Sequence, residues 1–80
     1  HDLEIYPNPT TTDLVIDRRG YAMELDVELY GLTGKQLMES HYEGSEPIRL
    51  DMRDYPAGVY LLKLRTAEGV VRNQRIIVQH

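Results

Sequence analysis

Serine, histidine and acidic residues are the side chains of this sequence that could support catalysis or bind a metal ion. The two serines are Ser40 and Ser45, and Ser40 directly precedes His41. A serine and a histidine act as nucleophile and base only when their side chains meet. Neighbouring residues of a strand point to opposite faces, so Ser40 and His41 cannot form such a pair with each other. Because cysteine is also absent, the sequence predicts no catalytic residues and no enzyme activity.

The histidines and aspartates offer equally little to a metal ion. The three histidines fall at the two ends and in the middle of the chain, without the spacing of metal ligands. Asp51 and Asp54 flank a short segment that could form one helical turn, and Asp13 or Asp17 could join them around calcium. However, the sequence has no Asp-x-Asp-x-Asp-Gly loop, and cap and turn roles explain these aspartates better. We therefore expect no metal site and no cofactor.

Length, charge and hydropathy exclude several classes of protein. Eighty residues form one domain, which we take as residues 1–80. The net charge is −4 and the basic residues are scattered, which argues against nucleic acid as a partner. No apolar run reaches the roughly 18 residues of a transmembrane segment. Because the chain begins at His1 without a methionine, we expect it to be a fragment, with a leader and most of the parent protein upstream.

The segment from Tyr55 to Leu64 predicts a sharp corner followed by a central strand. Pro56 fixes its own φ angle, and Gly58 supplies a backbone angle that other residues disfavour. Tyr60 follows two residues later, where sandwich domains often place a tyrosine whose hydroxyl bonds back to upstream backbone. Tyr60, Leu62 and Leu64 form one apolar face, and the other face turns polar halfway, so we expect this strand to be buried on one face and half covered on the other.

Six other segments show short strand patterns at intervals of about 8 to 12 residues, the spacing of an all-β sandwich. The Gly31–Gly34 and Ala67–Gly69 segments predict hairpin turns. The chain therefore predicts an all-β, immunoglobulin-like antiparallel β-sandwich of about seven short strands. The six further strands are expected at Asp2–Tyr6, Leu14–Ile16, Met23–Leu29, Lys35–Tyr42, Ile48–Leu50 and Val70–Val78, and the core at Leu3, Ile5, Leu14, Ile16, Leu25, Val27, Leu29, Leu37, Ile48, Leu50, Tyr60, Leu62, Leu64, Ile76 and Val78.

Short motifs in a fixed order resemble one protein family. A Tyr-Pro-Asn-Pro motif precedes an apolar-x-apolar strand, a Gly-Lys turn follows, then a Pro-Ala-Gly-x-Tyr corner, and a short β-rich segment closes the chain. This ordered set is similar to the C-terminal sorting domain of the type IX (Por) secretion system of Bacteroidota. The residues that carry the resemblance are Tyr6, Pro7, Asn8, Pro9, Gly34, Lys35, Pro56, Ala57, Gly58, Tyr60, Ile76, Ile77 and Val78.

The resemblance implies a non-catalytic sorting signal that directs a cargo protein through the periplasm and outer membrane to the cell surface. Its expected partners are the translocon, shuttle and sortase proteins of the type IX system. In the family, a surface sortase usually removes the domain and joins the cargo to a lipopolysaccharide. The chain departs from the family pattern at two places. Gly31 replaces a usual aspartate, and Ile76–Val78 runs into Gln79-His80 where a basic residue is common.

Residue types alone leave the roles of the motifs open. Pro7, Asn8 and Pro9 are either a recognition element or a rigid crossover between sheets, and the crossover explains them more simply. Gly58 and Tyr60 fit an architectural role better than a contact role. The last strand, Val70–Val78, is either an ordinary solvated edge strand or an edge to which a receptor adds a strand.

Two other functions compete with sorting. The first is a small immunoglobulin- or fibronectin-like adhesive or carbohydrate-binding module attached to a secreted enzyme. Such a module needs exposed aromatic rings. The second is a spacer or a permanent part of the secretion machinery itself, which cleavage upstream of Leu3 would contradict. The aromatic candidates for the first are Tyr6, Tyr21, Tyr30, Tyr42 and Tyr55.

Overall fold

The computed structural model describes residues 3–80, and these residues form seven strands. The predicted start of the first strand at Asp2 lies outside the described residues. The other predicted strands are present, with ends that differ by one or two residues. The strands are β1 (Glu4–Tyr6), β2 (Asp13–Asp17), β3 (Leu25–Gly31), β4 (Gln36–Tyr42), β5 (Ile48–Asp51), β6 (Gly58–Thr66) and β7 (Val71–Val78).

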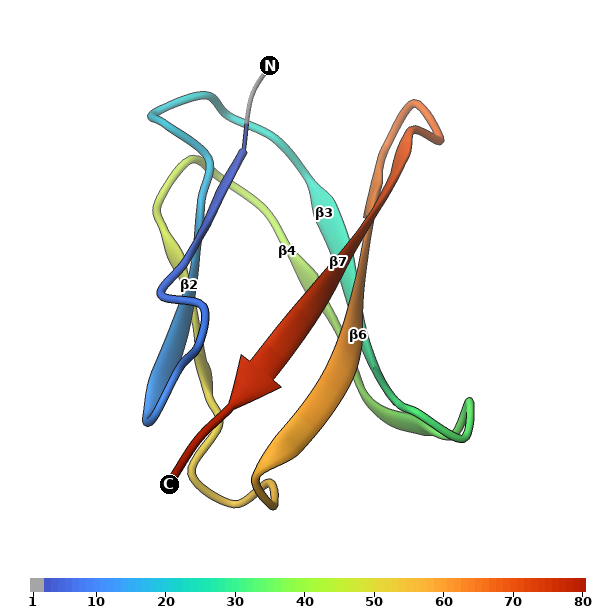
Figure 1. The fold of residues 1–80 in the computed structure, drawn as a ribbon. Helices are drawn as coiled ribbons and strands as arrows, with labels where there is room; N and C mark the ends of the chain where they lie inside the picture. Colours follow the sequence, from blue (N-terminus) through green and yellow to red (C-terminus); the bar gives the residue numbers. More distant parts are fainter. Residues whose placement is uncertain (1–2) are drawn as a thin grey trace.

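Two antiparallel sheets face each other across the core (Figure 1). The smaller sheet has the strand order β1-β2-β5, and the larger has the order β4-β3-β6-β7. This arrangement confirms the predicted all-β, immunoglobulin-like sandwich. The first and last strands, β1 and β7, each form an edge of their sheet. Among residues 3–80, no helix is long and apolar enough to cross a membrane.

Alternating apolar residues of the central strands β3 and β6 build the larger half of the core. In their antiparallel register Leu29 lies opposite Leu62, and Val27 lies opposite Leu64. These four side chains are at most 1% exposed. Each inward-facing residue thus packs beside another across the strand pair, as the period-2 pattern predicts.

The core differs from the prediction in strand β4. Leu37 was expected in the core but is exposed, and its neighbour Met38 packs against the core instead. The register shows why. Met38 lies opposite the buried Leu29, whereas Tyr30 lies opposite Gln36, so the register shifts by one residue and Leu37 of β4 has no partner in β3. Ile5 is only partly buried, whereas Met52 was not predicted in the core and is 1% exposed.

A buried arginine joins two loops at one end of the sandwich. Arg18 directly follows β2, and although it is charged it is only 2% exposed. Its Nε donates to the carbonyl oxygen of Glu46 at 2.9 Å, and its Nη1 donates to that of Met23 at 2.9 Å. The Met23 carbonyl is thus bound by Arg18, and β3 begins two residues later than the predicted strand, at Leu25.

The segment between β5 and β6 forms a turn instead of the helical turn that we considered. The amide of Tyr55 donates to the carbonyl oxygen of Met52 at 3.2 Å, which closes the turn. Asp51 begins this segment, and its carboxylate accepts hydrogen bonds from the backbone and the side chain of Arg53. These bonds lower the pKa of Asp51 to about 2. The turn role proposed for Asp51 therefore agrees with the structure.

Candidate functional site

The Tyr-Pro-Asn-Pro motif links β1 to β2 and brings the chain against the last strand. The peptide bonds before Pro7 and Pro9 are both cis. The exposed Asn8 lies between them, and its side-chain amide reaches the edge of β7. The amide nitrogen donates to the carbonyl oxygen of Arg75 at 2.8 Å, while its oxygen accepts from the amide of Ile77 at 2.9 Å. One side chain therefore satisfies two backbone groups of an edge strand, as a neighbouring strand would do.

Thr10 extends this contact along β7. Its amide donates to the carbonyl oxygen of Ile77 at 2.8 Å, and its own carbonyl accepts from the amide of Gln79 at 2.8 Å. Thr10 and Val78 consequently form a parallel bridge outside the named strands. The side chain of Thr10 is fully buried and donates to the carbonyl oxygen of Asp13 at 2.7 Å. We call the contacts of Asn8 and Thr10 with residues 75–79 the β7 clamp.

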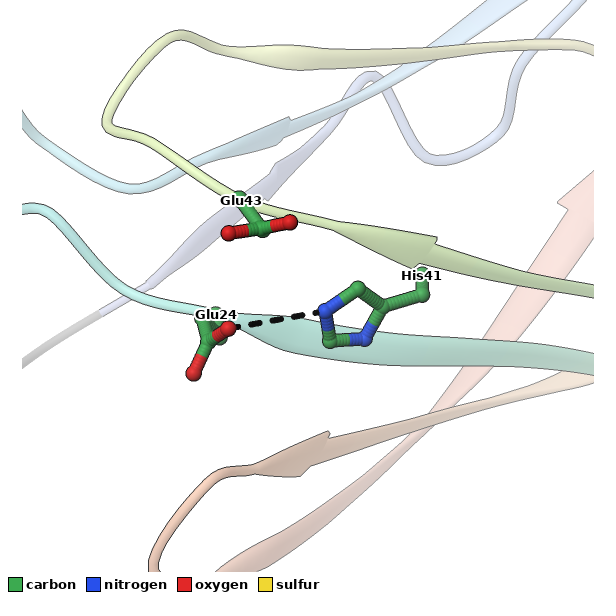
Figure 2. Close-up of side chains that lie close together, drawn as sticks. All are labelled: Glu24, His41 and Glu43. Carbon is green, nitrogen blue, oxygen red and sulfur yellow. Dashed lines mark ion pairs between the residues drawn. The ribbon is translucent and has the colours of Figure 1, made fainter.

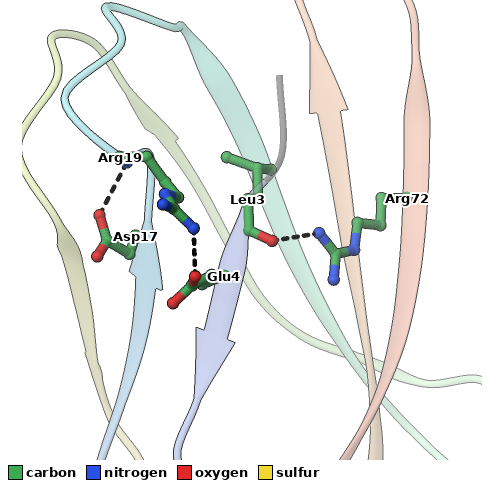
Figure 3. Close-up of polar contacts among 5 residues, drawn as sticks. All are labelled: Leu3, Glu4, Asp17, Arg19 and Arg72. Carbon is green, nitrogen blue, oxygen red and sulfur yellow. Dashed lines mark hydrogen bonds and ion pairs between the residues drawn. The ribbon is translucent and has the colours of Figure 1, made fainter.

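A second contact ties the beginning of the chain to the other end of β7. Arg72 donates through Nη1 to the carbonyl oxygen of Leu3 at 2.7 Å (Figure 3). On the other side of β1, Glu4 pairs with Arg19, whose backbone amide also donates to Asp17 at 2.8 Å. Arg72 binds Leu3 and the β7 clamp binds Asn8 and Thr10, so the segment of residues 3–10 contacts the last strand near both of its ends. Sequence reasoning did not identify Arg72 or Thr10, because neither lies in a recognisable motif.

Replacement of Asn8 by alanine is expected to loosen the end of β7. The change removes two hydrogen bonds at a partly solvated edge, so we expect a loss of about 1 to 2 kcal/mol in the free energy of unfolding. Hydrogen exchange should then accelerate most at the amide of Ile77. The matched control is Asn73→Ala, which removes an exposed side-chain amide on β7 that forms no hydrogen bond within residues 3–80. Equal exchange at Ile77 in both variants would contradict the assigned role of Asn8.

The predicted tyrosine corner is present after the Pro-Ala-Gly segment. The hydroxyl of Tyr60 donates to the carbonyl oxygen of Pro56 at 2.5 Å, and its ring packs edge-on against Tyr55 with centroids 5.8 Å apart. Gly58 has a φ angle of +156°, which L side chains rarely adopt, although a Cβ there would meet no atom within 4 Å. Backbone conformation, and not space, therefore favours glycine at this position.

Tyr60→Phe is expected to lower the free energy of unfolding by about 1 to 2 kcal/mol. The ring stays in place, but the Pro56 carbonyl loses its buried partner. For a domain of this length such a change corresponds to a fall in Tm of roughly 4 to 15 °C. Thermal denaturation followed by circular dichroism measures the change. Tyr30→Phe is the matched control, since its hydroxyl bonds Glu28 on the solvent face. A Tm unchanged by Tyr60→Phe would contradict a stabilising corner.

The pieces of the predicted sorting motif meet at one end of the sandwich. In the antiparallel register Gly31 lies opposite Tyr60, and Tyr60 lies opposite Ile76. The turn that contains Gly34 and Lys35 follows Gly31, and the β7 clamp joins Asn8 to this same end. Gly34 also borders a groove of about 500 Å³ on the outer face of β6 and β7. Motif residues far apart in sequence are therefore neighbours in the fold.

The residues considered for catalysis do not form a catalytic group. Ser40 lies opposite the buried Val27 on the inner face, whereas His41 lies opposite Asp26 on the outer face. The Nδ1 atom of His41 is 2.7 Å from a carboxylate oxygen of Asp26, and this bond raises the pKa of His41. Sequence spacing did not reveal a different cluster, in which Glu24 and Glu43 come close to His41.

The tyrosines considered as a sugar-binding platform are also less available than expected. Tyr42 and Tyr55 pack against the core. Tyr6 and Tyr21 are 42% and 49% exposed, but the first lies in β1 and the second in the loop that leads to β3. The adhesive or carbohydrate-binding alternative therefore has fewer exposed rings than the sequence suggested.

Comparison with known protein families gives a match over almost the whole chain. A family model described as the secretion system C-terminal sorting domain matches residues 4–79. The chain belongs to this family. Its domains are C-terminal sorting signals for type IX secretion and are generally non-catalytic. Membership of this family implies that the domain interacts with the type IX secretion machinery. It also implies export to the cell surface or secretion through the outer membrane.

A solved structure shares the fold of the sorting domain. It is the crystal structure of dimeric latent PorU from Porphyromonas gingivalis, which matches with a TM-score of 0.68 and 22% sequence identity. The match covers 96% of this chain and 9% of the PorU chain, so the sorting domain corresponds to a small part of that protein. At this identity the likeness establishes the fold alone. A search of curated proteins finds no match.

Proposed function

We propose that the secretion machinery reads this sorting domain in its folded state, at the edge of β7. The domain would end a larger secreted protein as one unit, residues 1–80, and carry no catalytic activity of its own. Its direct partners would be the type IX translocon and shuttle proteins, followed by a sortase that removes the domain from the upstream cargo. The motif residues would act mainly by shaping and holding this edge.

The observation that carries the proposal is the division of β7 into a covered and an open part. The outward backbone groups of Ile77 are bound by Asn8 and Thr10. Because strand geometry repeats every two residues, the backbone groups of Val71 and Asn73 point the same way. Within residues 3–80, no hydrogen bond to these groups is recorded. Among residues 3–80, the N-terminal motif therefore leaves the edge of β7 at Val71–Asn73 without a hydrogen-bonded neighbour.

The side chains beside the open edge suit a protein partner. Val70 and Val71 are 64% and 43% exposed, and Ile77 is 37% exposed further along the strand. The outer face of β7 also carries Arg75, which borders the groove together with Leu61. An added strand would gain backbone hydrogen bonds from the edge and apolar contacts from these side chains. This combination supports recognition by strand addition.

The position of Leu3 supports sortase cleavage before the folded part of the domain. Leu3 is 9% exposed, and its carbonyl oxygen is held by Arg72. A protease needs an extended segment that is free of such contacts. Cleavage upstream of Leu3 would release the cargo and leave the sandwich intact.

Asn73→Pro tests the proposed mode of recognition. Proline removes the outward amide of residue 73 but none of the bonds between β6 and β7, because Asn73 lies at a position that faces away from β6. Residues 1–80 are fused behind a leader peptide and a fluorescent reporter in a type IX-competent host. We expect Asn73→Pro to lower surface and medium fluorescence at least fivefold and Asn73→Ala to preserve it.

Folding of each variant is checked first by circular dichroism of the isolated domain. If Asn73→Pro folds and is exported as well as the Asn73→Ala control, strand addition at this edge is wrong. If Asn73→Pro unfolds, Val71→Lys provides the second test, because the charge opposes edge pairing without removing a backbone donor. Normal export of a folded Val71→Lys variant would also reject the proposed contact.

A further inference from the structure

A group of side chains that could bind a metal ion lies where β3 begins and β4 ends, at the opposite edge of the larger sheet from β7. Glu24, His41 and Glu43 each offer one ligand atom, and these atoms all lie within 4.8 Å of one another (Figure 2). The Nε2 atom of His41 is 3.7 Å from a carboxylate oxygen of Glu24. All three side chains are exposed, so an ion could reach them from solvent.

The sheet register brings these ligands together. Leu25 pairs with Tyr42 and Asp26 pairs with His41, so one further step of the register sets Glu24 opposite Glu43. A hydrogen bond of 2.9 Å from the amide of Met23 to the carbonyl of Gly44 closes the ladder beyond this position. His41 consequently lies in β4, whereas Glu24 and Glu43 lie directly before β3 and directly after β4, next to the last paired residues of the two strands.

Asp26 orients the imidazole of His41 toward the carboxylates. Its carboxylate lies 2.7 Å from Nδ1, on the opposite side of the ring from Glu24. With a proton on Nδ1, the lone pair of Nε2 points to Glu24 and can bind an ion. Histidine ligands of metals commonly have such a carboxylate partner, which fixes the tautomer and the ring orientation.

Arg65 and Lys63 of β6 lie opposite Asp26 and Glu28 on the outer face, but Glu24 and Glu43 lie beyond them. Glu24 and Glu43 face each other across the strand pair, as do Glu28 and Glu39 farther along. Like charges directly opposite each other destabilise a sheet. No lysine or arginine among residues 3–80 forms an ion pair with Glu24 or Glu43. A bound cation would relieve this repulsion.

We propose that Glu24, His41 and Glu43 bind a divalent transition-metal ion of the zinc class. One imidazole nitrogen with two carboxylate oxygens suits zinc better than calcium or magnesium, which prefer oxygen ligands alone. Ligands of one tetrahedral zinc ion lie about 3.3 Å apart, given metal–ligand distances of about 2.0 to 2.2 Å. Small rotations of the exposed glutamates bring the three atoms to this spacing. Water completes the coordination.

Calorimetric titration with Zn²⁺ alone tests the site. The background chain carries His1→Gln and His80→Gln, so that His41 is the single imidazole. We expect saturable binding of one ion, with shifts in the NMR signals of the His41 ring. His41→Gln should weaken binding at least tenfold, and Glu24→Gln or Glu43→Gln should each weaken it severalfold. Glu39→Gln, on the same face but outside the cluster, is the matched control.

Asp26→Asn separates positioning from coordination. We expect Zn²⁺ affinity to fall 10- to 100-fold while the Tm without metal stays within a few degrees of the parent chain. Addition of Ca²⁺ should not displace Zn²⁺. Absence of saturable Zn²⁺ binding, or equal affinity in His41→Gln and its parent, would overturn the proposal. Equal weakening by Glu39→Gln and Glu24→Gln would also overturn it, since the ion would then respond only to the charge of the face.

Discussion

Removal of residues 76–80 is expected to unfold the sorting domain and abolish export of its cargo. Ile76 and Val78 are 0% and 1% exposed, so the deletion empties two core positions. Each truncated core side chain costs about 2 to 5 kcal/mol. The β7 clamp also loses its partners, because Asn8 and Thr10 bond to Ile77 and Gln79. The sum is comparable with the total stability of a small domain, about 5 to 15 kcal/mol.

Circular dichroism of the shortened chain measures the loss of folding, and the reporter fusion measures export. Ile77→Thr is the control, since residue 77 is 37% exposed and threonine preserves both the branched shape and the clamped backbone. This variant should fold with a Tm close to that of the parent. A cooperative thermal transition in the chain that ends at Arg75 would show that the last strand is not part of the folded core.

Arg18→Ala is expected to cost about 3 to 5 kcal/mol in the free energy of unfolding. The guanidinium is 2% exposed and donates to the carbonyl oxygens of Glu46 and Met23. Hydrogen bonds from a charged donor contribute about 1.5 to 3 kcal/mol each, and their loss leaves carbonyl groups without a partner in a partly buried region. Urea denaturation of the parent and the variant gives the difference directly.

Arg19→Ala is the matched control for this prediction. Arg19 follows Arg18 in the same turn, but its ion pair with Glu4 is exposed, with both side chains about half accessible. Such surface pairs contribute at most about 1 kcal/mol. Similar losses from Arg18→Ala and Arg19→Ala would mean that the buried guanidinium does not hold the two loops together.

Local patterns in the sequence were sufficient to predict most of the sandwich. The apolar residues of β3 alternate strictly with acidic residues, and only a strand places them on one face. The corner depends on local preferences, because Pro56 restricts its own φ angle, Gly58 adopts an angle that other residues avoid, and Tyr60 follows two residues later. The hydrogen bond from Tyr60 to the Pro56 carbonyl could therefore be predicted from the sequence. Features of this kind depend on residues that are close together in the sequence.

Features that depend on distant partners could not be read in the same way. Arg18 resembles any polar turn residue until the Glu46 loop is placed beside it. Leu37 and Met38 are adjacent apolar residues, and only the irregular register of β3 and β4 decides which one faces the core. The cluster around His41 likewise depends on that register.

The candidate site could also be predicted from the sequence only in part. The order of the motifs indicated a sorting domain, and the family assignment agrees with it. Their spacing gave no sign that the side chain of Asn8 would bind the backbone of residues 75 and 77. That contact joins the beginning of the domain to its end. This contact gives a physical reason why a sorting signal built from separate motifs would require the folded domain.

Export of a reporter fused to residues 1–80 tests the central claim most directly. The fusion carries a leader peptide and is expressed in a type IX-competent Bacteroidota host and in a translocon-deficient strain of that host. We expect reporter at the surface or in the medium of the competent host alone. Reporter retained in the periplasm of both strains, with the domain folded, would contradict a sorting role for this chain.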